Sequence, residues 1–538
     1  MDSAYERSRR LVAELLAHPE RLPFPARQAR LIETHISWVL LFGDDVLKLK
    51  KPVRMGFIDF STLARRDHFA HEELRLNRRL APELYLDVLR ITGTPEAPRV
   101  GGEGDLLEPA VHMRQFDPEG QLDLQLDRGT LTAADVDVVA DLIARFQADA
   151  PRAEAADDWG RFPVVMAPVR ENYEQLREVA AGWEDDTTRA AFTDRLTVLE
   201  ARSEQWGEQL AELVEVRRAE GFVREGHGDL HLGNIARTPW GIRAFDCLEF
   251  SPDLRWIDVV SDLAFLYMDL AERGRPDLAW TLVNGWATRT GDHAGLCLLP
   301  FYALYRTMVR VKVAALRRDQ LEDAAARAGC DAERFAYLAL AERLAAPRRP
   351  VLVLTQGPSG SGKSHVASRL AVSLGAVHLR SDVERKRLFG LEGTHRTSVE
   401  EGARLYAADA TARTYEVLAE RAEALLRAGL HVVVDATFLA PAQRARFAAL
   451  AATIGVHGAL VACSASPATL AARIEARAAR GRDASDADPA VLAAQLEALV
   501  PLGEEVAGLE RFDFGERDDV AQFVATVVAR LRLATGRT

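Results

Sequence analysis

VLVLTQGPSGSGKS, at residues 351–364, decides the fold of the C-terminal part of this 538-residue chain. Its first four residues are apolar and predict a buried strand, and an apolar-periodic helix begins at Lys363. Between them, residues 357–364 fit the pattern GxxxxGKS, which binds phosphate groups when a strand precedes it and a helix follows it. The sequence therefore predicts a nucleotide-binding loop.

The residues of this loop have distinct expected roles. Glycines let the backbone approach the phosphates, so that N–H groups at a helix N-terminus point at them. Lys363 is expected to reach the β- and γ-phosphates of ATP, and the Ser364 hydroxyl is expected to bind Mg²⁺. The predicted cofactor-binding set is Gly357, Pro358, Ser359, Gly360, Ser361, Gly362, Lys363 and Ser364.

Strands alternate with helices after this loop. Apolar runs predict strands at 376–379, 431–434 and 459–462, and helical periodicity is found near 402–428, 441–454 and 467–480. This alternation is what an open parallel sheet with right-handed crossovers requires. We therefore expect a C-terminal α/β domain at 351–538, joined by a short linker at 346–350 to the preceding chain.

Five further positions in this domain are candidates for chemistry. Asp435 closes an apolar strand, where a carboxylate linked to magnesium belongs, although such an Asp can also be an ordinary turn residue. Asp382 could accept the proton of a substrate hydroxyl, and Arg385 could hold an acidic part of the substrate. Arg473 and Arg477 share a helix face and could stabilise a transferring phosphate, or they could form a solvated basic face.

The N-terminal part of the sequence has a different pattern of predicted strands and helices. Residues 30–116 predict a strand-rich lobe with one long helix near 62–80, and from residue 117 the chain becomes mainly helical. A small lobe of strands followed by a large helical lobe is the pattern of a two-lobed kinase. We expect one domain over residues 1–345, with a small lobe at about 30–116 and a helical lobe at about 117–345.

The segment GHGDLHLGN, residues 226–234, strengthens this hypothesis. An Asp followed five residues later by an Asn is the spacing of a kinase catalytic loop, in which the Asp orients the substrate hydroxyl and the Asn holds magnesium. Asp229 and Asn234 fill these positions, and His227 is expected to brace the loop. Asp246 ends the next apolar segment and is predicted to bind the metal as well.

Partner residues are expected in the first lobe. Lys48 occupies the central-strand position of the kinase lysine that contacts the nucleotide phosphates, and Glu73 on the following helix is its expected ion-pair partner. Lys50 is an alternative to Lys48 because side chains two residues apart share a strand face, and Glu72 is an alternative to Glu73.

Other charged residues are expected to be structural. Asp262 is interpreted as a helix cap or a loop-bracing group, and Asp59 as the cap of the helix that follows it. Arg306 and Arg310 share one helix face, which could bind phosphate or an acidic substrate, but a solvated face is favoured.

Residues 30–345 resemble the aminoglycoside phosphotransferase family, through HGDLHLGN at 227–234 and FDCLEF at 245–250. This resemblance implies a bilobal protein-kinase-like fold that transfers the γ-phosphoryl group of ATP to a hydroxyl of a small molecule. The C-terminal part is similar to P-loop kinases such as gluconate kinases, zeta toxins and polynucleotide 5′-kinases, through GPSGSGKS at 357–364, SDVER at 381–385 and VVVDAT at 432–437. The whole chain thus resembles bacterial phosphotransferases fused to an ATP-binding domain.

The amino-acid composition limits the classes of binding partner that we expect. A net charge of −12 and a pI near 5.7 disfavour a general nucleic-acid or membrane-surface binder, and small-molecule substrates are expected. The first residues lack an apolar signal core, which predicts a cytoplasmic protein; no feature indicates an oligomeric state. Two alternatives remain open: the C-terminal domain phosphorylates nucleic-acid 5′ ends, or one domain is a nucleotide-binding regulator of the other.

Overall fold

The computed structural model describes residues 3–55, 58–319, 321–393, 395, 397–480 and 489–536. The chain forms two compact units. The first comprises Met1–Asp269 and Tyr305–Arg334, and the second comprises Leu270–Leu304 and Phe335–Thr538. The second unit is therefore discontinuous in sequence, because it includes a segment that precedes its main body.

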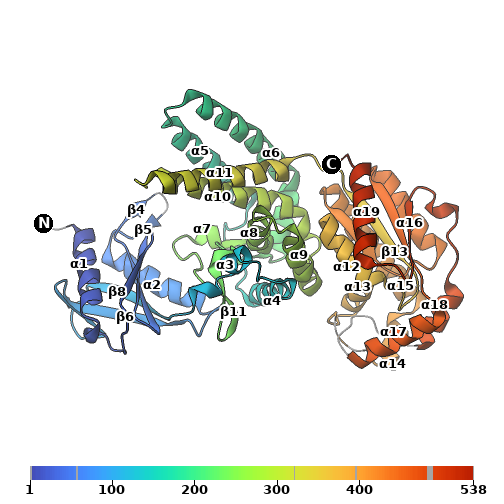
Figure 1. Ribbon diagram of the computed structural model, residues 1–538, viewed down its shortest axis with the longest axis horizontal. Helices are drawn as coiled ribbons and strands as arrows, with labels where there is room; N and C mark the ends of the chain where they lie inside the picture. Colours follow the sequence, from blue (N-terminus) through green and yellow to red (C-terminus); the bar gives the residue numbers. More distant parts are fainter. Residues whose placement is uncertain are drawn as a thin grey trace. The chain divides into compact units, whose positions relative to one another are not determined.

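An antiparallel sheet forms the small lobe of the first unit (Figure 1). The strands follow the order β1-β2-β3-β8-β6-β7, and every neighbouring pair is antiparallel. Their bounds are β1 Arg30–Glu33, β2 Ser37–Leu41, β3 Asp45–Lys50, β6 Tyr85–Thr94, β7 Ala97–Val100 and β8 Glu108–Arg114. A short hairpin, β4 Arg54–Met55 and β5 Ile58–Asp59, follows β3.

Two helices cover the opposite faces of this sheet. Helix α1 (Ala4–Ala17) packs Leu11 into the cluster that contains Leu47, whereas α2 (Leu63–Asn77) packs Ala70 into the cluster that contains Val46. Neighbouring residues of β3 point to opposite faces because a strand has a side-chain period of two. This periodicity places the central strand β3 between two apolar layers.

The predicted cap of α2 is wrong. Thr62 is the N-cap residue, and its hydroxyl accepts a hydrogen bond from the Arg65 N–H at 3.3 Å. Asp59 instead accepts hydrogen bonds from the N–H and the hydroxyl of Ser61, at 3.1 and 2.6 Å. Asp59 therefore braces the turn before the helix.

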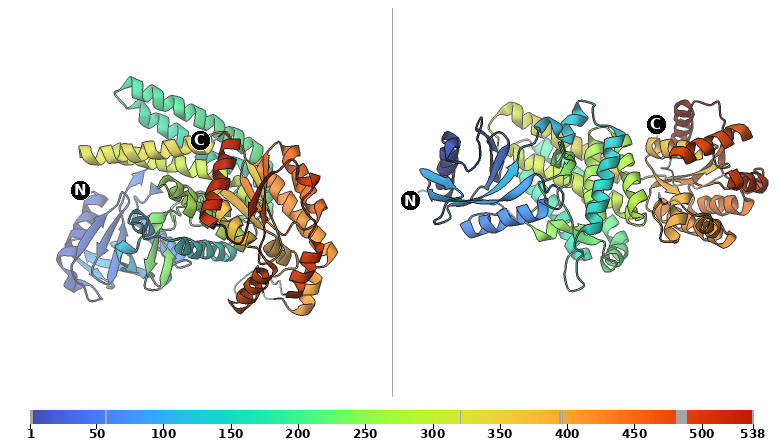
Figure 2. Two further views of the ribbon diagram at one scale, coloured as in Figure 1. Left: turned by 45° about the vertical axis from the view of Figure 1, so that its right-hand side comes forward. Right: turned by 90° about the horizontal axis from the view of Figure 1, so that it is seen from below.

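Helices make up most of the remainder of the first unit. Two of them, α5 and α6, form a long antiparallel hairpin (Figure 2). Helices α8, α10 and α11 each contribute residues to both units. The bounds are α3 Leu122–Asp127, α4 Ala133–Asp149, α5 Phe162–Ala181, α6 Asp186–Ala219, α7 Pro252–Arg255, α8 Val259–Glu272, α10 Leu299–Asp319 and α11 Ala324–Ala345.

Four short strands support the loops of the helical lobe. Strand β9 (Val223–Glu225) pairs with β12 (Trp256–Asp258), and β10 (Ile235–Thr238) forms a hairpin with β11 (Gly241–Ala244). The segment 226–234 connects β9 to β10, and Asp246 follows β11. The two motifs that the sequence analysis singled out therefore lie at the ends of one hairpin.

The second unit is built on a five-stranded parallel sheet in the order β14-β15-β13-β16-β17. The strands are β13 Val351–Gln356, β14 Ala376–Arg380, β15 His431–Asp435, β16 His457–Cys463 and β17 Glu510–Phe514. The helices are α9 Pro276–Thr290, α12 Lys363–Leu374, α13 Ser381–Leu388, α14 Val399–Leu405, α15 Ala408–Arg427, α16 Pro441–Ile454, α17 Pro467–Arg480, α18 Pro489–Ala498 and α19 Val520–Ala534.

Helices cover both faces of this parallel sheet (Figure 1). Leu370 of α12 and Val527 of α19 pack with Val353 and Val433 in one core cluster, and α15 and α16 contact β15 and β16. Strand, loop and helix therefore follow one another around residues 351–374 as the sequence predicts. Among the described residues, no helix is both long and apolar enough to cross a membrane.

Candidate active sites

The catalytic-loop candidate of the first unit is closed by its own side chains. Asn234 donates from Nδ2 to the main-chain oxygen of Asp229 at 2.9 Å and to its carboxylate at 3.3 Å. The buried His227 lies with Nε2 3.0 Å from the oxygen of Phe245, and its Nδ1 accepts the Asp229 N–H at 3.3 Å. His227 thus links the loop to the segment that carries Asp246.

Two buried charges hold the same loop from outside. The Asp262 carboxylate accepts the N–H groups of His227 and Gly228, at 2.7 and 3.0 Å. Arg306 donates from Nη1 to the oxygen of Gly228 at 2.9 Å, and it is only 3% exposed. The interpretation of Asp262 as a loop-bracing residue is confirmed. The expectation of a solvated face at Arg306 is wrong, because that side chain is buried against the loop.

Lys48 and Lys50 of β3 contact the same carboxylate. Lys48 Nζ lies 2.7 Å from Glu73 Oε1 and 2.5 Å from Asp246 Oδ1. Lys50 Nζ lies 2.8 Å from Glu73 Oε2 and also contacts Glu249. The side chain of Lys48 is 15% exposed and that of Lys50 is 1% exposed. Lys48 therefore faces the candidate metal carboxylate, and Lys50 lies in the interior.

Charge pairing decides the ionisation of these groups. Burial alone would raise the pKa of Glu73, but Lys48 and Lys50 lower it to about 2. Burial alone would lower the pKa of Lys48, but Asp246 and Glu73 raise it well above its ordinary value. Glu73 and Lys48 are consequently an ion pair at neutral pH, which is the state that a phosphate-binding lysine needs. The alternative partner Glu72 instead pairs with Arg75.

Asp246 has a specialised backbone. Its φ of +63° lies in the left-handed region, which Asp visits more readily than most residues. The Asp246 N–H donates to the Tyr85 hydroxyl at 3.2 Å, and the next N–H, of Cys247, donates to Asn77 Oδ1 at 2.8 Å. These small-lobe residues fix the turn that presents the Asp246 carboxylate, which remains 45% exposed.

Asp229 is ionised at neutral pH. Burial opposes its negative charge, but the neighbouring His231, 3.7 Å away, lowers the pKa of Asp229 below its ordinary value. An anionic Asp229 can accept a hydrogen bond from an acceptor hydroxyl. Asn234 and Asp246 supply oxygen atoms of the kind that Mg²⁺ prefers.

Substitutions of Lys50 and Lys48 should have different effects: the first should mainly reduce the stability of the protein, and the second should mainly reduce its activity. Lys50→Met leaves Glu249 buried without its lysine partner, whereas Glu73 keeps Lys48, and the loss of a buried partner costs about 3–5 kcal/mol. Lys48→Met should cost much less stability, because Asp246 is partly exposed, but it should remove nucleotide-dependent activity of this site. Calorimetry of the full-length variants checks the first claim. Equal destabilisation by both substitutions would contradict it.

The phosphate loop of the second unit has room only for glycine at key positions. A Cβ on Gly357 would lie 2.2 Å from the oxygen of Cys463, and one on Gly360 would lie 2.8 Å from the oxygen of Leu470. The φ values of Gly357, Gly360 and Gly362 are +139°, +86° and +97°, which side chains disfavour. Lys363 begins α12 and donates from Nζ to the oxygen of Pro358 at 2.9 Å. The loop therefore fits a phosphate-binding cradle.

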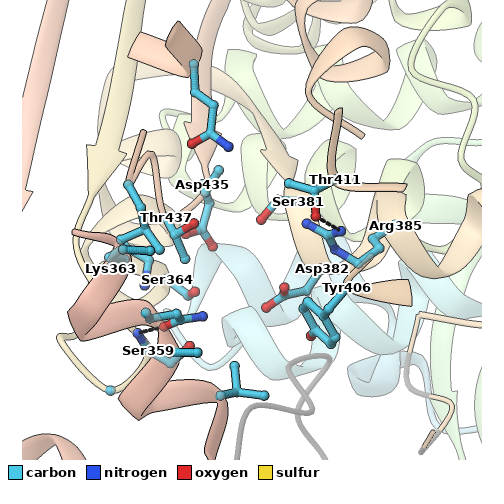
Figure 3. Close-up of a pocket in the computed structure, with 18 of the residues that line it drawn as sticks. Ser359, Lys363, Ser364, Ser381, Asp382, Arg385, Tyr406, Thr411, Asp435 and Thr437 are labelled. Carbon is cyan, nitrogen blue, oxygen red and sulfur yellow. Dashed lines mark hydrogen bonds between the residues drawn. The ribbon is translucent and has the colours of Figure 1, made fainter. Parts of the chain in front are cut away.

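A cavity of about 550 Å³ opens beside this loop (Figure 3). Lys363 and Ser364 lie on one side of the cavity, Asp382 and Arg385 lie on the other, and Asp435 lies between them. The structure thus brings together residues that the sequence analysis selected from three separate motifs. Arg473 also lines the cavity and donates from Nη1 to the oxygen of Gly360 at 3.1 Å. The side chain of Arg477 lies outside the described part of the structure.

The pKa values of the two carboxylates in this cavity are shifted in opposite directions. Burial and the charge of Asp435 raise the pKa of Asp382 above its ordinary value. Burial opposes ionisation of Asp435 too, but His378, with Nε2 3.6 Å from Asp435 Oδ2, keeps the pKa of Asp435 below its ordinary value. Asp435 is therefore the better metal ligand, and Asp382 is the better proton acceptor.

Arg385 is only partly satisfied by the protein. Its Nη1 donates to the oxygen of Leu405 at 2.8 Å and to the Thr411 hydroxyl at 3.0 Å. The buried Nε has no hydrogen-bond partner among the described residues, and the guanidinium lies 4.9 Å from the ring centre of Tyr406. Three lining residues carry no signal in the sequence: Tyr406, Thr411 and Gln495, whose Oε1 accepts the Ser359 N–H at 2.7 Å.

The shift of Asp382 predicts a pH dependence. Because its pKa is raised, Asp382 loses its basic form at a higher pH than an ordinary Asp as the solution is acidified. The rate at the second site should therefore fall along an acid limb that Asp382→Asn removes. Asp435→Asn should move the limb to lower pH by removing a repulsive charge. Rate profiles against pH, recorded in an Asp229→Ala background, measure both effects; a limb unaffected by Asp382→Asn would contradict the assignment.

The comparisons with known proteins cover both units. Residues 352–502 match the AAA domain family. Proteins of Mycobacterium tuberculosis and Mycobacterium bovis, each described as uncharacterised, are 33% identical over 457 residues, which is 84% of this chain and 87% of theirs.

Solved structures align with each part of the chain. A gluconokinase from Sinorhizobium meliloti 1021 is 23% identical and covers 35% of this chain and 96% of its own, with a TM-score of 0.26. A choline kinase from Cryptosporidium parvum is 11% identical and covers 63% of this chain and 96% of its own, with a TM-score of 0.39. By identity and coverage, the chain belongs to the family of the two mycobacterial proteins, and within it residues 352–502 match the AAA domain.

Proposed function

We propose that this protein is an ATP-dependent phosphotransferase with two active sites, each of which transfers the γ-phosphoryl group to a hydroxyl of a small molecule or metabolite. One observation supports the proposal: each unit contains a lysine and two carboxylates, of which one is suited to bind a metal ion and the other to accept a proton. In the first unit these are Lys48, Asp246 and Asp229. In the second unit they are Lys363, Asp435 and Asp382.

Magnesium would complete both sites. Within the part of the chain that the structure describes, no group of three or more His, Cys, Asp or Glu side chains could hold a metal ion. Mg²⁺ is commonly held by one or two carboxylates together with nucleotide phosphates and water. Asn234 and Asp246 would hold it in one site, and Ser364 and Asp435 in the other. When bound, Mg²⁺ supplies charge neutralisation to the phosphates.

The protein side chains would orient the substrates, accept the proton and bind the phosphates. Asp229 would orient the acceptor hydroxyl and take its proton in the first site, while Lys48 attracts the nucleotide phosphates. Asp382 would take the proton in the second site, with Lys363 and Arg473 placed at the phosphate loop. Positioning and charge neutralisation account for most catalysis of this type.

A small acceptor suits the second site better than a nucleic-acid end. An extended basic groove beside residues 385–387 would favour a polynucleotide. Arg385 and Lys386 are instead 7% and 2% exposed, and Arg387 bonds to the oxygen of Thr288 at 2.9 Å. These three side chains are therefore not displayed as a groove for a phosphate backbone.

The test is a panel of acceptors offered to the full-length protein with ATP and Mg²⁺. Sugars, sugar acids, amino alcohols, nucleosides and an oligonucleotide with a 5′-hydroxyl are compared by ADP release and by mass spectrometry of the products. We expect small hydroxyl compounds to stimulate ADP release and to gain one phosphoryl group. Stimulation by the oligonucleotide alone would favour a 5′-end kinase, and no stimulation by any member would contradict the proposed reaction.

A further inference from the structure

Helix α9 and the short helix η4 (Gly295–Leu298) precede the phosphate loop in sequence but belong to the second unit. There α9 packs against α12 (Figure 1) and against β14, and η4 packs against α15. Strand β14 leads directly into α13, the helix that carries Asp382 and Arg385. The α9–η4 segment therefore lies against the elements that support the acceptor half of the cavity.

The first contact covers the edge of the sheet. Asn284 of α9 donates from Nδ2 to the oxygen of Ala376 at 3.0 Å, and its Oδ1 accepts the His378 N–H at 2.9 Å. Because β14 is an edge strand, no other strand in the described part of the chain lies on that side to bond to these two backbone groups. Trp280 packs beside them, so closely that a Cβ on Gly375 would lie 2.8 Å from its Nε1. The amide of Asn284 thus takes the place of a further strand.

The second contact joins α9 to α13. Arg387 of α13 donates from Nη2 to the oxygen of Thr288, in the last turn of α9, at 2.9 Å. A cation is favourable there because the C-terminus of a helix carries partial negative charge. Gly291 follows with φ +76°, and a Cβ at that position would lie 2.4 Å from Arg387 Nε. The end of α9 is therefore shaped to receive this arginine.

Glu384 adds a buried ionic contact. It is 1% exposed, forms salt bridges with Arg387 and Arg421, and has His293, of the loop before η4, 3.7 Å from Oε1. Burial and the two arginines lower the pKa of His293 to about 3, so the histidine is neutral. Glu384 is thus a carboxylate whose buried charge is balanced by arginines from α13 and α15.

The side chains of α13 divide between two faces. Asp382 and Arg385, three residues apart, line the cavity. Glu384 and Arg387, also three residues apart, face α9 and the loop before η4. Residues with this spacing share one side of a helix, so fixing the second pair fixes the rotation of the first.

We propose that α9–η4 is a positioning element of the second active site, which sets the orientation of α13 and hence the placement of Asp382 and Arg385. The inference rests on the proposed phosphotransfer function. It assigns to Asn284, Arg387 and Glu384 a role exerted through α13. The site built on the phosphate loop therefore depends on a segment that lies within the kinase-like part of the sequence.

Arg387→Ala in the full-length protein tests this role. In an Asp229→Ala background, ATP hydrolysis with water as the acceptor reports on the second site alone. We expect kcat to fall about 10- to 100-fold, as misplacement of a catalytic group does, with little change in KM for ATP. Hydrogen exchange of residues 381–388 should become at least about tenfold faster. Arg387→Lys should recover part of both losses, because an ammonium group can still donate to the oxygen of Thr288.

Two further variants provide a second test and a control. Asn284→Ala removes the other contact and should change the same two readouts, while Arg413→Ala, an arginine on α15 with a 58% exposed side chain, should change neither. Unchanged exchange at 381–388 in both Arg387→Ala and Asn284→Ala would overturn the proposal. Equal loss of protection throughout β13 and β15 would also overturn it, since that indicates general loosening. If the parent protein hydrolyses no ATP and phosphorylates no member of the acceptor panel, the proposed function fails, while hydrogen exchange still decides the positioning role.

Discussion

Replacing Lys363 with alanine should abolish phosphoryl transfer at the second site, with a loss of about 10³-fold in kcat. The physical reason is the loss of a cation at the phosphate loop, where Lys363 Nζ lies 2.9 Å from the oxygen of Pro358. The glycine backbone of the loop remains, so the unit should stay folded. Acceptor-dependent product formation in an Asp229→Ala background measures the effect.

The matched control for Lys363→Ala lies on the same helix. Arg369 of α12 is exposed, and Arg369→Ala removes a positive charge without touching the cavity. It should leave product formation within about twofold of the parent, as surface substitutions usually do. Full activity of Lys363→Ala, or an equal loss in Arg369→Ala, would contradict the assignment of the phosphate loop.

Asp229→Asn should remove phosphoryl transfer at the first site, by about 10²- to 10⁴-fold, which is the usual contribution of a proton-accepting side chain. The substitution keeps the shape of the residue but removes the anion that His231 stabilises. The Asn234 side chain can still donate to the main-chain oxygen of residue 229, so the loop should keep its closed form. Binding of ATP should therefore change little.

The two site variants together also test the regulatory alternative. Asp229→Asn and Lys363→Ala should each eliminate different products from the acceptor panel. If both eliminate the same products, one unit regulates the other and only one transfers phosphate. Asp194→Asn, which replaces an exposed carboxylate on α6, is the control for the first unit and should retain every product.

The sequence predicted those site residues that lie close to one another along the chain. Residues 357–364 and the pair Asp229 and Asn234 were found because a phosphate loop and a catalytic loop impose fixed spacings. The pattern of β3 also predicted that Lys48 and Lys50 share a face. The sequence favoured Lys48 with Lys50 as the alternative, and in the structure Lys48 contacts Asp246, which lies 198 residues away along the chain.

Residues that act across long separations could not be predicted in this way. Arg306 bonds to Gly228 across 78 residues, and Gln495 bonds to Ser359 across 136, so neither interaction leaves a periodic signal. A charged residue within the mostly buried helix α10 was the one available indication for Arg306. Strand β17 was missed for a different reason: it is a half-exposed edge strand with the sequence ERFDF, too polar to resemble a buried strand.

Asn284 also affects the solubility of this protein, because it covers the edge of a sheet. An uncovered edge strand offers unpaired N–H and C=O groups to any other chain, and natural sheets protect such edges to avoid aggregation. Here the protection of β14 comes from α9, which lies upstream of residue 351. A fragment that begins at Val351 keeps the phosphate loop but leaves this edge open to self-association. Helix α9 therefore also gives the second sheet a cover against aggregation.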